Sequence, residues 1–357
     1  LMESCKGGHL DCVNLLLEQD TDDCPDDHGS TAFHVSCAGG HCDCAKALVK
    51  AGTDVTATDN DGKTGWALAS AAGHSDVTRF LELQLLSAGK ENQEALLRSY
   101  ILGEVDINAT DEGDEGMSAF HICCASGFAG CVEALVEAGC TVTEKNSDGK
   151  SGRDLALSGD HDAVAQVLDH AMIAAAKAGS TERMSNFLDI GVAVDTSHAQ
   201  SGRTALMEAA AGGHGDILTI LINNSAVVDT ADDTGMTAYL LACKSGSKDC
   251  VQKLIAADAN LAASSEAGTG WTLGNDAVKE VLQKALLQFS AAGTSDRLAD
   301  LVESGVVTSA TTSTGGSALM ESCKGGHLDC VNLLLEQDTD DCPDDHGSTA
   351  FHVSCAG

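Results

Sequence analysis

The sequence predicts an all-α solenoid in which short helix–turn–helix units alternate with β-hairpin fingers. Two repeat lengths carry this prediction. A motif of Thr or Ser, a small residue and an apolar residue recurs in steps of 33 and 32 residues, as at Thr204, Thr237 and Thr269. Residues 1–39 also return without a substitution as residues 319–357, which gives a second period of 318 residues. Self-similarity at a fixed period is typical of repeat arrays and not of separate globular domains.

The unit that begins at Thr31 shows how the pattern produces structure. Thr31 is a residue type that caps helix N-termini, and residues 32–38 are predicted to form a short helix after it. Apolar residues at helical spacing over 44–49 predict a second helix. Residues 53–58 are strand-like, and residues 59–62 predict a turn, so this segment is the expected finger. Neither helix can bury its apolar face alone, and stacked neighbours must supply the core.

This unit resembles the ankyrin repeat. The resemblance covers essentially the whole chain, and residues 202–229 match as clearly as the first unit. The family's proline is replaced by Ala or Gly in every unit, which weakens each helix start slightly. The resemblance implies a protein-binding surface on the fingers and inner helices. The matching residues are Gly29-x-Thr31-Ala32-Phe33-His34, Gly40-His41, Leu48-Val49 and Gly52-x-Asp54-Val55.

Three longer steps between motifs indicate joints between capped domains. The steps of 54, 53 and 48 residues each hold an extra helix pair without the Thr motif, which fits only if one finger has been deleted. The segments before and after each deletion resemble capping repeats. One period therefore predicts three fused, capped sub-arrays of three, four and four repeats. We expect residues 1–82 to be the C-terminal part of a four-repeat domain, 83–169 a three-repeat domain, 170–284 a four-repeat domain, and 285–357 the N-terminal part of the next copy of the first domain.

The joints are predicted to be continuous helices. Residues 162–178 and 275–292 contain no Gly or Pro and are rich in Ala, Leu, Val, Gln and Lys, which favours unbroken helix. We expect the last helix of one domain to run into, or pack against, the first helix of the next.

The charge balance bounds the partners. The formal net charge is −34, and removing the second copy of residues 1–39, which carries −7, leaves −27 for one period. Such acidity disfavours nucleic acid and anionic membrane surfaces, and it favours basic proteins or cations. Acidic side chains gather in two predicted fingers, although a solvated face is the commoner explanation of such clusters. They are Asp20, Asp22, Asp23, Asp26 and Asp27 in one finger, and Asp111, Glu112, Asp114 and Glu115 in the other.

Cysteines recur in pairs seven residues apart, one late in an inner helix and one early in an outer helix. Two interpretations stay open. The cysteines are small buried apolar residues of an intracellular protein, which is slightly favoured, or they form a disulfide within each repeat in an oxidising, extracellular compartment. Cys24, Cys42, Cys123 and Cys140 have no obvious partner. The pairs are Cys5 with Cys12, Cys37 with Cys44, Cys124 with Cys131, and Cys243 with Cys250.

Other candidate sites are weaker. The clusters His41-Cys42-Asp43-Cys44 and His121-Ile122-Cys123-Cys124 contain zinc-ligand types at spacings that fit no common zinc site. The turn at Asp59-Asn60-Asp61-Gly62 lacks the acidic last position of a calcium loop. No metal, cofactor or catalytic site is predicted, because nucleotide-binding and nucleophile motifs are missing from the sequence. Trp66 and Trp271 begin the predicted C-capping repeats, where they cover a joint or anchor a partner.

Two functions remain from the sequence. In the first, the protein is structural: a segment of a long array of capped ankyrin domains that associates with copies of itself in a superhelical filament. The verbatim period motivates this hypothesis, because each of its copies starts and stops in mid-pattern. In the second, it is an adaptor that binds protein partners on a concave acidic surface.

Overall fold

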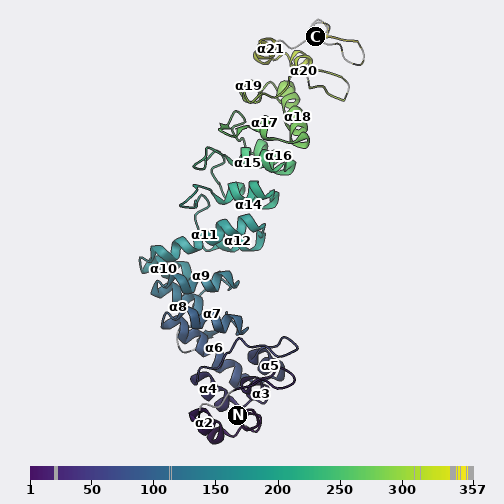
Figure 1. The fold of residues 1–357 in the computed structure, drawn as a ribbon. Helices are drawn as coiled ribbons and strands as arrows, with labels where there is room; N and C mark the ends of the chain where they lie inside the picture. The colour runs from purple at the N-terminus through teal and green to yellow at the C-terminus, as the bar shows by residue number, and fades with distance from the viewer. Residues whose placement is uncertain are drawn as a thin grey trace. The chain divides into compact units, whose positions relative to one another are not determined.

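The computed structural model describes residues 1–19, 23–111, 113, 115–308, 310–313, 315–337, 343, 345, 347–350 and 352. The chain divides into two compact units (Figure 1). The first contains residues 1–171 and 189–191, and the second contains residues 172–188 and 192–357. Each unit is a succession of antiparallel helix pairs, as the sequence predicts.

The helices and strands through α10 are α1 (Met2–Lys6), α2 (Leu10–Glu18), α3 (Ala32–Ala38), α4 (Cys42–Lys50), α5 (Gly65–Ala72), α6 (Ser75–Lys90), α7 (Glu94–Leu102), β1 (Thr110–Asp111), β2 (Met117–Ser118), α8 (Ala119–Ser126), α9 (Ala129–Glu137) and α10 (Gly152–Ser158).

The elements that follow are α11 (Asp162–Ala178), α12 (Thr181–Asp189), α13 (Ala205–Gly212), α14 (Gly215–Asn223), α15 (Ala238–Ser245), α16 (Lys248–Ala256), β3 (Ser264–Ser265), β4 (Gly268–Thr269), α17 (Gly270–Leu273), α18 (Asp276–Ala292), α19 (Ser295–Glu303), α20 (Ala318–Gly325) and α21 (Leu328–Leu335).

The helices form an inner and an outer layer in each unit. In the first unit α1, α3 and α5 stack in the inner layer, and α2, α4 and the start of α6 stack in the outer layer. The Thr and Ser residues of the motif begin the inner helices as predicted: the Thr31 hydroxyl accepts a hydrogen bond from His34 N at 3.5 Å, and α3 spans Ala32–Ala38. Side chains such as Cys37, Leu48 and Leu135 are fully buried between the layers and form the core.

Long helices replace fingers at the joints, which confirms the prediction of unbroken helices. α6 packs on α4 in the outer layer and on α8 in the inner layer, and α18 does the same with α16 and α20. The buried stripe of α18 runs without interruption through Val278, Leu282, Leu286 and Ser290. α11 is likewise one helix of 17 residues. The predicted domain boundaries at residues 82, 169 and 284 stay a prediction.

The fingers contain little regular strand. Two antiparallel pairs, β1 with β2 and β3 with β4, have two residues in each strand. The strand expected at residues 53–58 is wrong, because this segment is formed of turns and irregular structure. Asp54 accepts hydrogen bonds from the backbone and hydroxyl of Thr56, and Asp59 accepts from the backbone of Asp61 and Lys63. Short acidic side chains therefore hold the finger by local bonds that compete with a β-ladder.

The duplicated sequence has two different settings. In the first copy Cys5 and Val13 are fully buried, because they face the repeat that follows. In the second copy the counterparts of these residues are half-buried, and Cys330 and Leu334 are fully buried instead because they face α19. Identical residues thus form two opposite packing faces, one for each neighbour.

Candidate functional site

The histidines of the Gly-His turns tie neighbouring repeats together. In each, Nε2 donates to a backbone carbonyl near the C-terminus of the preceding inner helix, so the ring is already used by the scaffold. His41, a member of the first zinc candidate, belongs to this set. The contacts are His41 to Lys6 O at 3.0 Å, His74 to Ala38 O at 2.9 Å, His161 to Ala125 O at 3.0 Å, His214 to Lys177 O at 3.1 Å and His327 to Ala291 O at 3.0 Å.

His121, from the second zinc candidate, is also a scaffold residue. Its Nδ1 lies 2.8 Å from the Ser118 hydroxyl, and its Nε2 donates to Glu144 O at 3.0 Å. Burial lowers the pKa of His121 and favours the neutral ring that these two bonds require. Within the described ranges, no three His, Cys, Asp or Glu side chains converge on a point where a metal ion would bind.

The eight paired cysteines are free thiols in the structure. Cys12 is exposed and the other seven are buried. Burial raises the pKa of Cys5 to about 11, and it raises the pKa of Cys37 and of Cys243 to about 12. A thiol with a raised pKa carries little thiolate at neutral pH and reacts slowly. The proposed disulfides within repeats stay a prediction.

The thiols have neighbours that the seven-residue spacing did not suggest. Cys123 lies within hydrogen-bonding reach of Cys131, and the charge of Cys44 acts on Cys5 from the adjacent repeat. Cys123 and Cys131 also donate to Gly89 O and Asn92 Oδ1, at 3.8 and 3.6 Å, at the end of α6. Their thiols therefore help to hold the repeat that begins at Ser118 against the long joint helix.

Three aromatic side chains fit against glycines of the next repeat, a relationship that sequence reasoning missed. A Cβ built on Gly65 would lie 2.7 Å from Phe33 Cδ1. Phe120 occupies the corresponding space at Gly152, and Tyr239 does so at Gly270. The signal was present in the motif: an aromatic third residue is followed by Gly in the next motif, whereas Leu206 is followed by Ala238 and Leu319 by Ala350.

Trp66 and Trp271 lie half-buried at the two joints formed by α6 and α18. Trp66 Nε1 is buried without a hydrogen-bond partner among the described residues, and Lys279 Nζ lies 5.5 Å from the Trp271 ring centroid. The hydroxyls that precede them span the missing finger. Thr64 Oγ1 donates to Gly103 O at 2.9 Å, and Thr269 Oγ1 donates to Ser304 O at 2.6 Å. Whether the tryptophans also anchor a partner stays a prediction.

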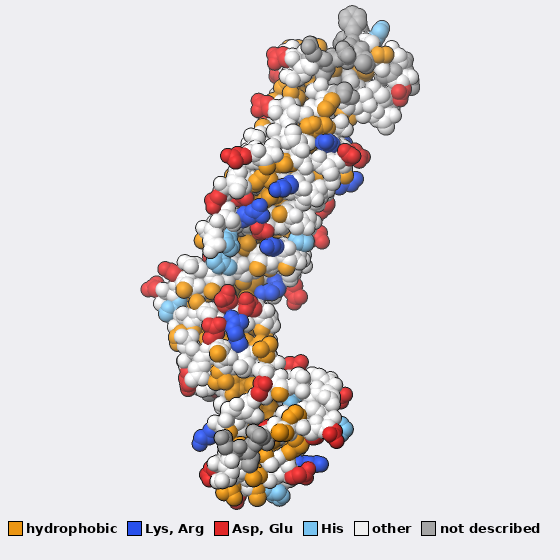
Figure 2. Space-filling model, viewed as in Figure 1, with side chains coloured by type: hydrophobic (Ala, Val, Ile, Leu, Met, Phe, Trp, Pro, Cys, Tyr) orange, Lys and Arg blue, Asp and Glu red, His pale blue; other side chains and the backbone are white. Residues whose placement is uncertain are grey.

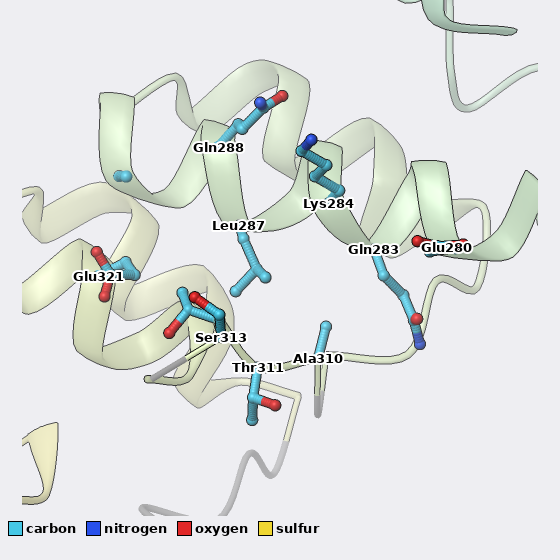
Figure 3. Close-up of a pocket in the computed structure, with 11 residues that line it drawn as sticks. Glu280, Gln283, Lys284, Leu287, Gln288, Ala310, Thr311, Ser313 and Glu321 are labelled. Atoms are coloured by element: carbon cyan, nitrogen blue, oxygen red, sulfur yellow. The ribbon is translucent and has the colours of Figure 1, made fainter. Parts of the chain in front are cut away.

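A groove lies where α18 takes the place of a finger (Figure 3). Its volume is about 860 Å³. Leu287 points from α18 toward the finger residues Ala310 and Thr311, whereas Lys284 and Gln288 point away from that finger. We name this site the α18 groove and define it by its lining residues, which are Glu280, Gln283, Lys284, Leu287, Gln288, Ala291, Ala310, Thr311, Thr312, Ser313 and Glu321.

The same place on α6 is bridged by the chain's own cations. Arg79 Nη1 donates to Thr110 O at 2.9 Å and lies 3.4 Å from a Glu82 carboxylate oxygen. Lys90 Nζ lies 3.4 Å from Asp111 Oδ2. These two side chains connect α6 to its finger.

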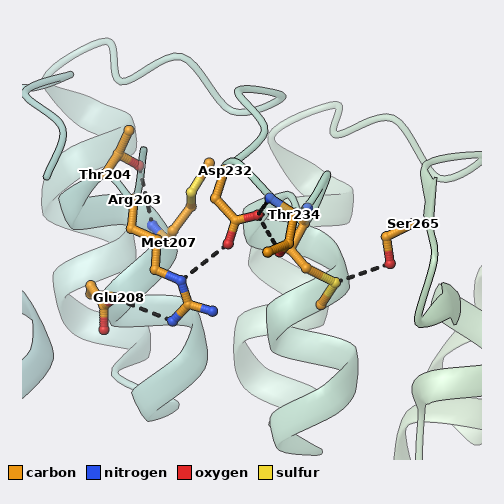
Figure 4. Close-up of polar contacts among 8 residues, drawn as sticks. Arg203, Thr204, Met207, Glu208, Asp232, Thr234 and Ser265 are labelled. Carbon is orange, nitrogen blue, oxygen red and sulfur yellow. Dashed lines mark hydrogen bonds and ion pairs between the residues drawn. The ribbon is translucent and has the colours of Figure 1, made fainter. Parts of the chain in front are cut away.

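Neighbouring fingers are joined by a second polar network (Figure 4). Arg203 Nε lies 3.1 Å from Asp232 Oδ2, and Asp232 Oδ1 accepts from the backbone and hydroxyl of Thr234 and from Met236 N. Burial raises the pKa of Asp232, but these hydrogen bonds outweigh it and hold the pKa below the ordinary value. The carboxylate is therefore a structural anion of the second unit.

The acidic fingers are partly used in the same way. Asp23 Oδ1 accepts from Ala32 N at 2.8 Å, Asp26 Oδ1 accepts from Ser30 N at 2.9 Å, and Asp111 faces Lys90. Figure 2 shows Asp and Glu side chains spread over the visible surface of both units and not gathered in one patch. The predicted finger residues Asp20, Asp22, Glu112 and Asp114 lie outside the described residues.

The helices are also too short or too polar to cross a bilayer. Within the part of the chain that the structure describes, no helix combines the length and the apolar character that a membrane span needs.

Comparisons with known proteins agree with this architecture. The profile described as "Ankyrin repeats (3 copies)" matches residues 1–84, 171–264 and 277–357. The chain is 25% identical over 288 residues to Ankyrin repeat and KH domain-containing protein mask-1 of Caenorhabditis elegans, covering 71% of this chain and 10% of that protein. It is 31% identical over 142 residues to the E3 ubiquitin-protein ligase XBAT33 of Arabidopsis thaliana, covering 36% of this chain and 28% of that protein.

A third relative is the Transient receptor potential cation channel subfamily A member 1 homolog of Caenorhabditis elegans, 23% identical over 219 residues, which are 58% of this chain and 16% of the channel. The chain spans less than a third of the length of each of these relatives. The profile covers well over half of the chain, and the helix pairs, fingers and capping hydroxyls follow the same repeat. The chain therefore belongs to the ankyrin-repeat family, whose repeats mediate protein–protein interaction and are typically non-catalytic.

Proposed function

We propose that the chain is a non-catalytic structural array: a segment of a tandem ankyrin protein with a 318-residue super-repeat, which forms a superhelical filament or fibre through contacts with copies of itself. The observation that carries the proposal is the pair of identical sequences with complementary burial. Residues 1–19 bury the side that faces the following repeat, and residues 319–337 bury the side that faces the preceding one. A copy with both neighbours would bury both sides, which suits continuous stacking.

The joints support the same proposal. α6 and α18 each pass from the outer layer of one stack to the inner layer of the next, and hydroxyls from Thr64 and Thr269 bridge the place of the missing finger. Such a joint lets stacked helices continue from one sub-array to the next without a flexible linker. Repetition of a fixed joint generates a helical path, because each period adds the same rotation and rise.

Electron microscopy of the native protein tests this proposal. We expect fibres with a regular axial or helical repeat, and denaturing electrophoresis should show a polypeptide much longer than one period. Dispersed particles from a polypeptide no longer than 357 residues would contradict the structural array.

A second candidate function is an adaptor for protein partners that carry basic segments. The α18 groove favours it, because an open site on the finger side of the helices is edged by Glu280 and Glu321 in a chain of net charge −34. Pull-down with acidic and basic peptides of equal length distinguishes the candidate: preference for the basic peptide at about 0.15 M salt supports it. Equal retention of both peptides contradicts it.

A further inference from the structure

The two joints formed by α6 and α18 can be compared residue by residue. The buried positions Val77, Leu81 and Leu85 of α6 correspond to Val278, Leu282 and Leu286 of α18, a constant offset of 201 residues. The same offset relates the two fingers, because Thr110 pairs with Ser118 and Thr311 pairs with Ser317 at the start of the next inner helix.

This alignment shows what differs at the α18 groove. Arg79 corresponds to Glu280, and Lys90 corresponds to Ala291. The two cations that bridge α6 to its finger are therefore replaced by a carboxylate and a methyl group. Gln283 takes the place of Glu82, and the Thr311 carbonyl takes the place of the Thr110 carbonyl that accepts from Arg79. The groove is open at the position where the first joint holds a guanidinium.

We propose that the α18 groove binds an arginine side chain from a basic segment of a partner protein, in the place that Arg79 occupies at the α6 joint. This inference rests on the adaptor function proposed above and names its binding site. The guanidinium would donate to the Thr311 carbonyl and to the Glu280 carboxylate, with the Gln283 amide oxygen as a further acceptor. Its methylenes would lie along Leu287 and Ala310.

Arginine fits this site better than lysine does. A guanidinium carries five donors in one plane, so it can bond to a carbonyl on the finger and a carboxylate on the helix together. The ammonium of a lysine is a point charge that pairs with a single acidic group, as Lys90 does with Asp111. The threonines at the counterpart finger, Thr311 and Thr312, offer no such acidic group.

The test uses the whole 357-residue chain and three short fluorescent peptides. One peptide carries a central arginine pair, and the other two carry lysine or citrulline at the same positions. Citrulline keeps the shape of arginine and removes its charge. At about 0.15 M salt we expect the arginine peptide to bind at least about tenfold more tightly than the citrulline peptide, because charged hydrogen bonds are lost in the latter. Equal binding of the two peptides would overturn the proposal, as would binding of none.

Variants at the groove separate this site from general acidity. Glu280→Gln is expected to weaken arginine-peptide binding about tenfold. Glu303→Gln, on the exposed surface of α19 outside the groove, removes the same charge and should leave binding unchanged. Similar weakening by both substitutions would mean attraction by net charge alone and would overturn the site.

A transplant and its reverse keep the test independent of folding defects. Ala291→Lys together with Thr312→Asp recreates the Lys90 and Asp111 pair and is expected to block the groove. Arg79→Ala should open the counterpart groove on α6 and raise the number of bound peptides from one to two per chain. Unchanged stoichiometry in Arg79→Ala, with an unchanged circular dichroism spectrum, would contradict the alignment of the two sites. Electron micrographs report on the array separately, so fibres without peptide binding would reject the groove alone.

Discussion

Phe120 occupies the space that a side chain at Gly152 would need. A Cβ on Gly152 would lie 2.8 Å from Phe120 Cδ1, and the two residues belong to successive inner helices, α8 and α10. Since Phe33 with Gly65 and Tyr239 with Gly270 show the same relationship, bulk in one repeat is matched by a missing side chain in the next.

Gly152→Ala is therefore expected to lower the free energy of unfolding by about 1–3 kcal/mol, because the new methyl group overpacks a closed interior. Phe120→Leu in the same chain should recover most of this loss, since Leu206 already faces an alanine, Ala238. Urea unfolding of the two single variants and the double variant measures the coupling. Ala238→Gly is the matched control and should not need a compensating aromatic. Additive effects of the first two substitutions would contradict the fit.

Asp232→Asn should destabilise the second unit by about 1–3 kcal/mol, because a buried carboxylate that accepts several hydrogen bonds is lost and Arg203 loses its partner. The pKa of Asp232 is lowered in the folded state. Its contribution is thus present above the unfolded pKa of about 3.9 and is lost as the pH falls through the lower folded pKa. Thermal unfolding from pH 6 to pH 2 should show a smaller difference between wild type and Asp232→Asn at the acid end. A constant difference would exclude this residue as an acid-sensitive contact.

Thr64→Val should destabilise the joint by about 1–3 kcal/mol, since it removes the cap of α5 and leaves the Gly103 carbonyl without its hydroxyl donor. Hydrogen exchange over residues 94–105 should accelerate. Thr204→Val is the control, because Thr204 caps α13 in the same way and is followed by a finger. Thr64→Ser keeps the hydroxyl and should resemble wild type. If Thr204→Val costs as much as Thr64→Val, the bond across the joint adds nothing beyond the cap.

Cys12 and Cys330 occupy the same place in identical sequences, yet Cys12 is exposed and Cys330 is fully buried. Burial also raises the pKa of Cys330. Iodoacetamide added to the folded protein should therefore modify Cys12 and spare Cys330. Mass spectrometry can separate them, because trypsin releases the first in a peptide that continues to Lys46 and the second in one that ends at Gly357. Equal labelling would contradict the packing of α21 on α19. Omitting the reductant in a parallel digest of native material tests the intracellular and extracellular interpretations of the cysteines.

Much of this protein follows from its sequence, because ankyrin repeats are built from local signals. Thr31 and Ser118 mark helix starts through hydroxyls that bond to amides three residues later, and uninterrupted helix formers mark α18. Such bonds join residues close in the chain, so spacing alone places them. The acidity and the 318-residue period need no coordinates. The strand expected at 53–58 was wrong because local bonds to Asp54 and Asp59 replaced a ladder.

The contacts between repeats were decided by the tertiary structure. Whether Cys5 or Cys330 is buried depends on which neighbour is present, and the two residues have counterparts of identical sequence at the other copy. Arg79 reaches Thr110 across 31 residues, and the absence of an equivalent cation at Glu280 becomes a groove only once α18 and its finger lie side by side. The sequence by itself determined the helices, their caps and their order. Stacking decided which side chains are covered and which space stays open, because burial depends on neighbours that are remote in the chain.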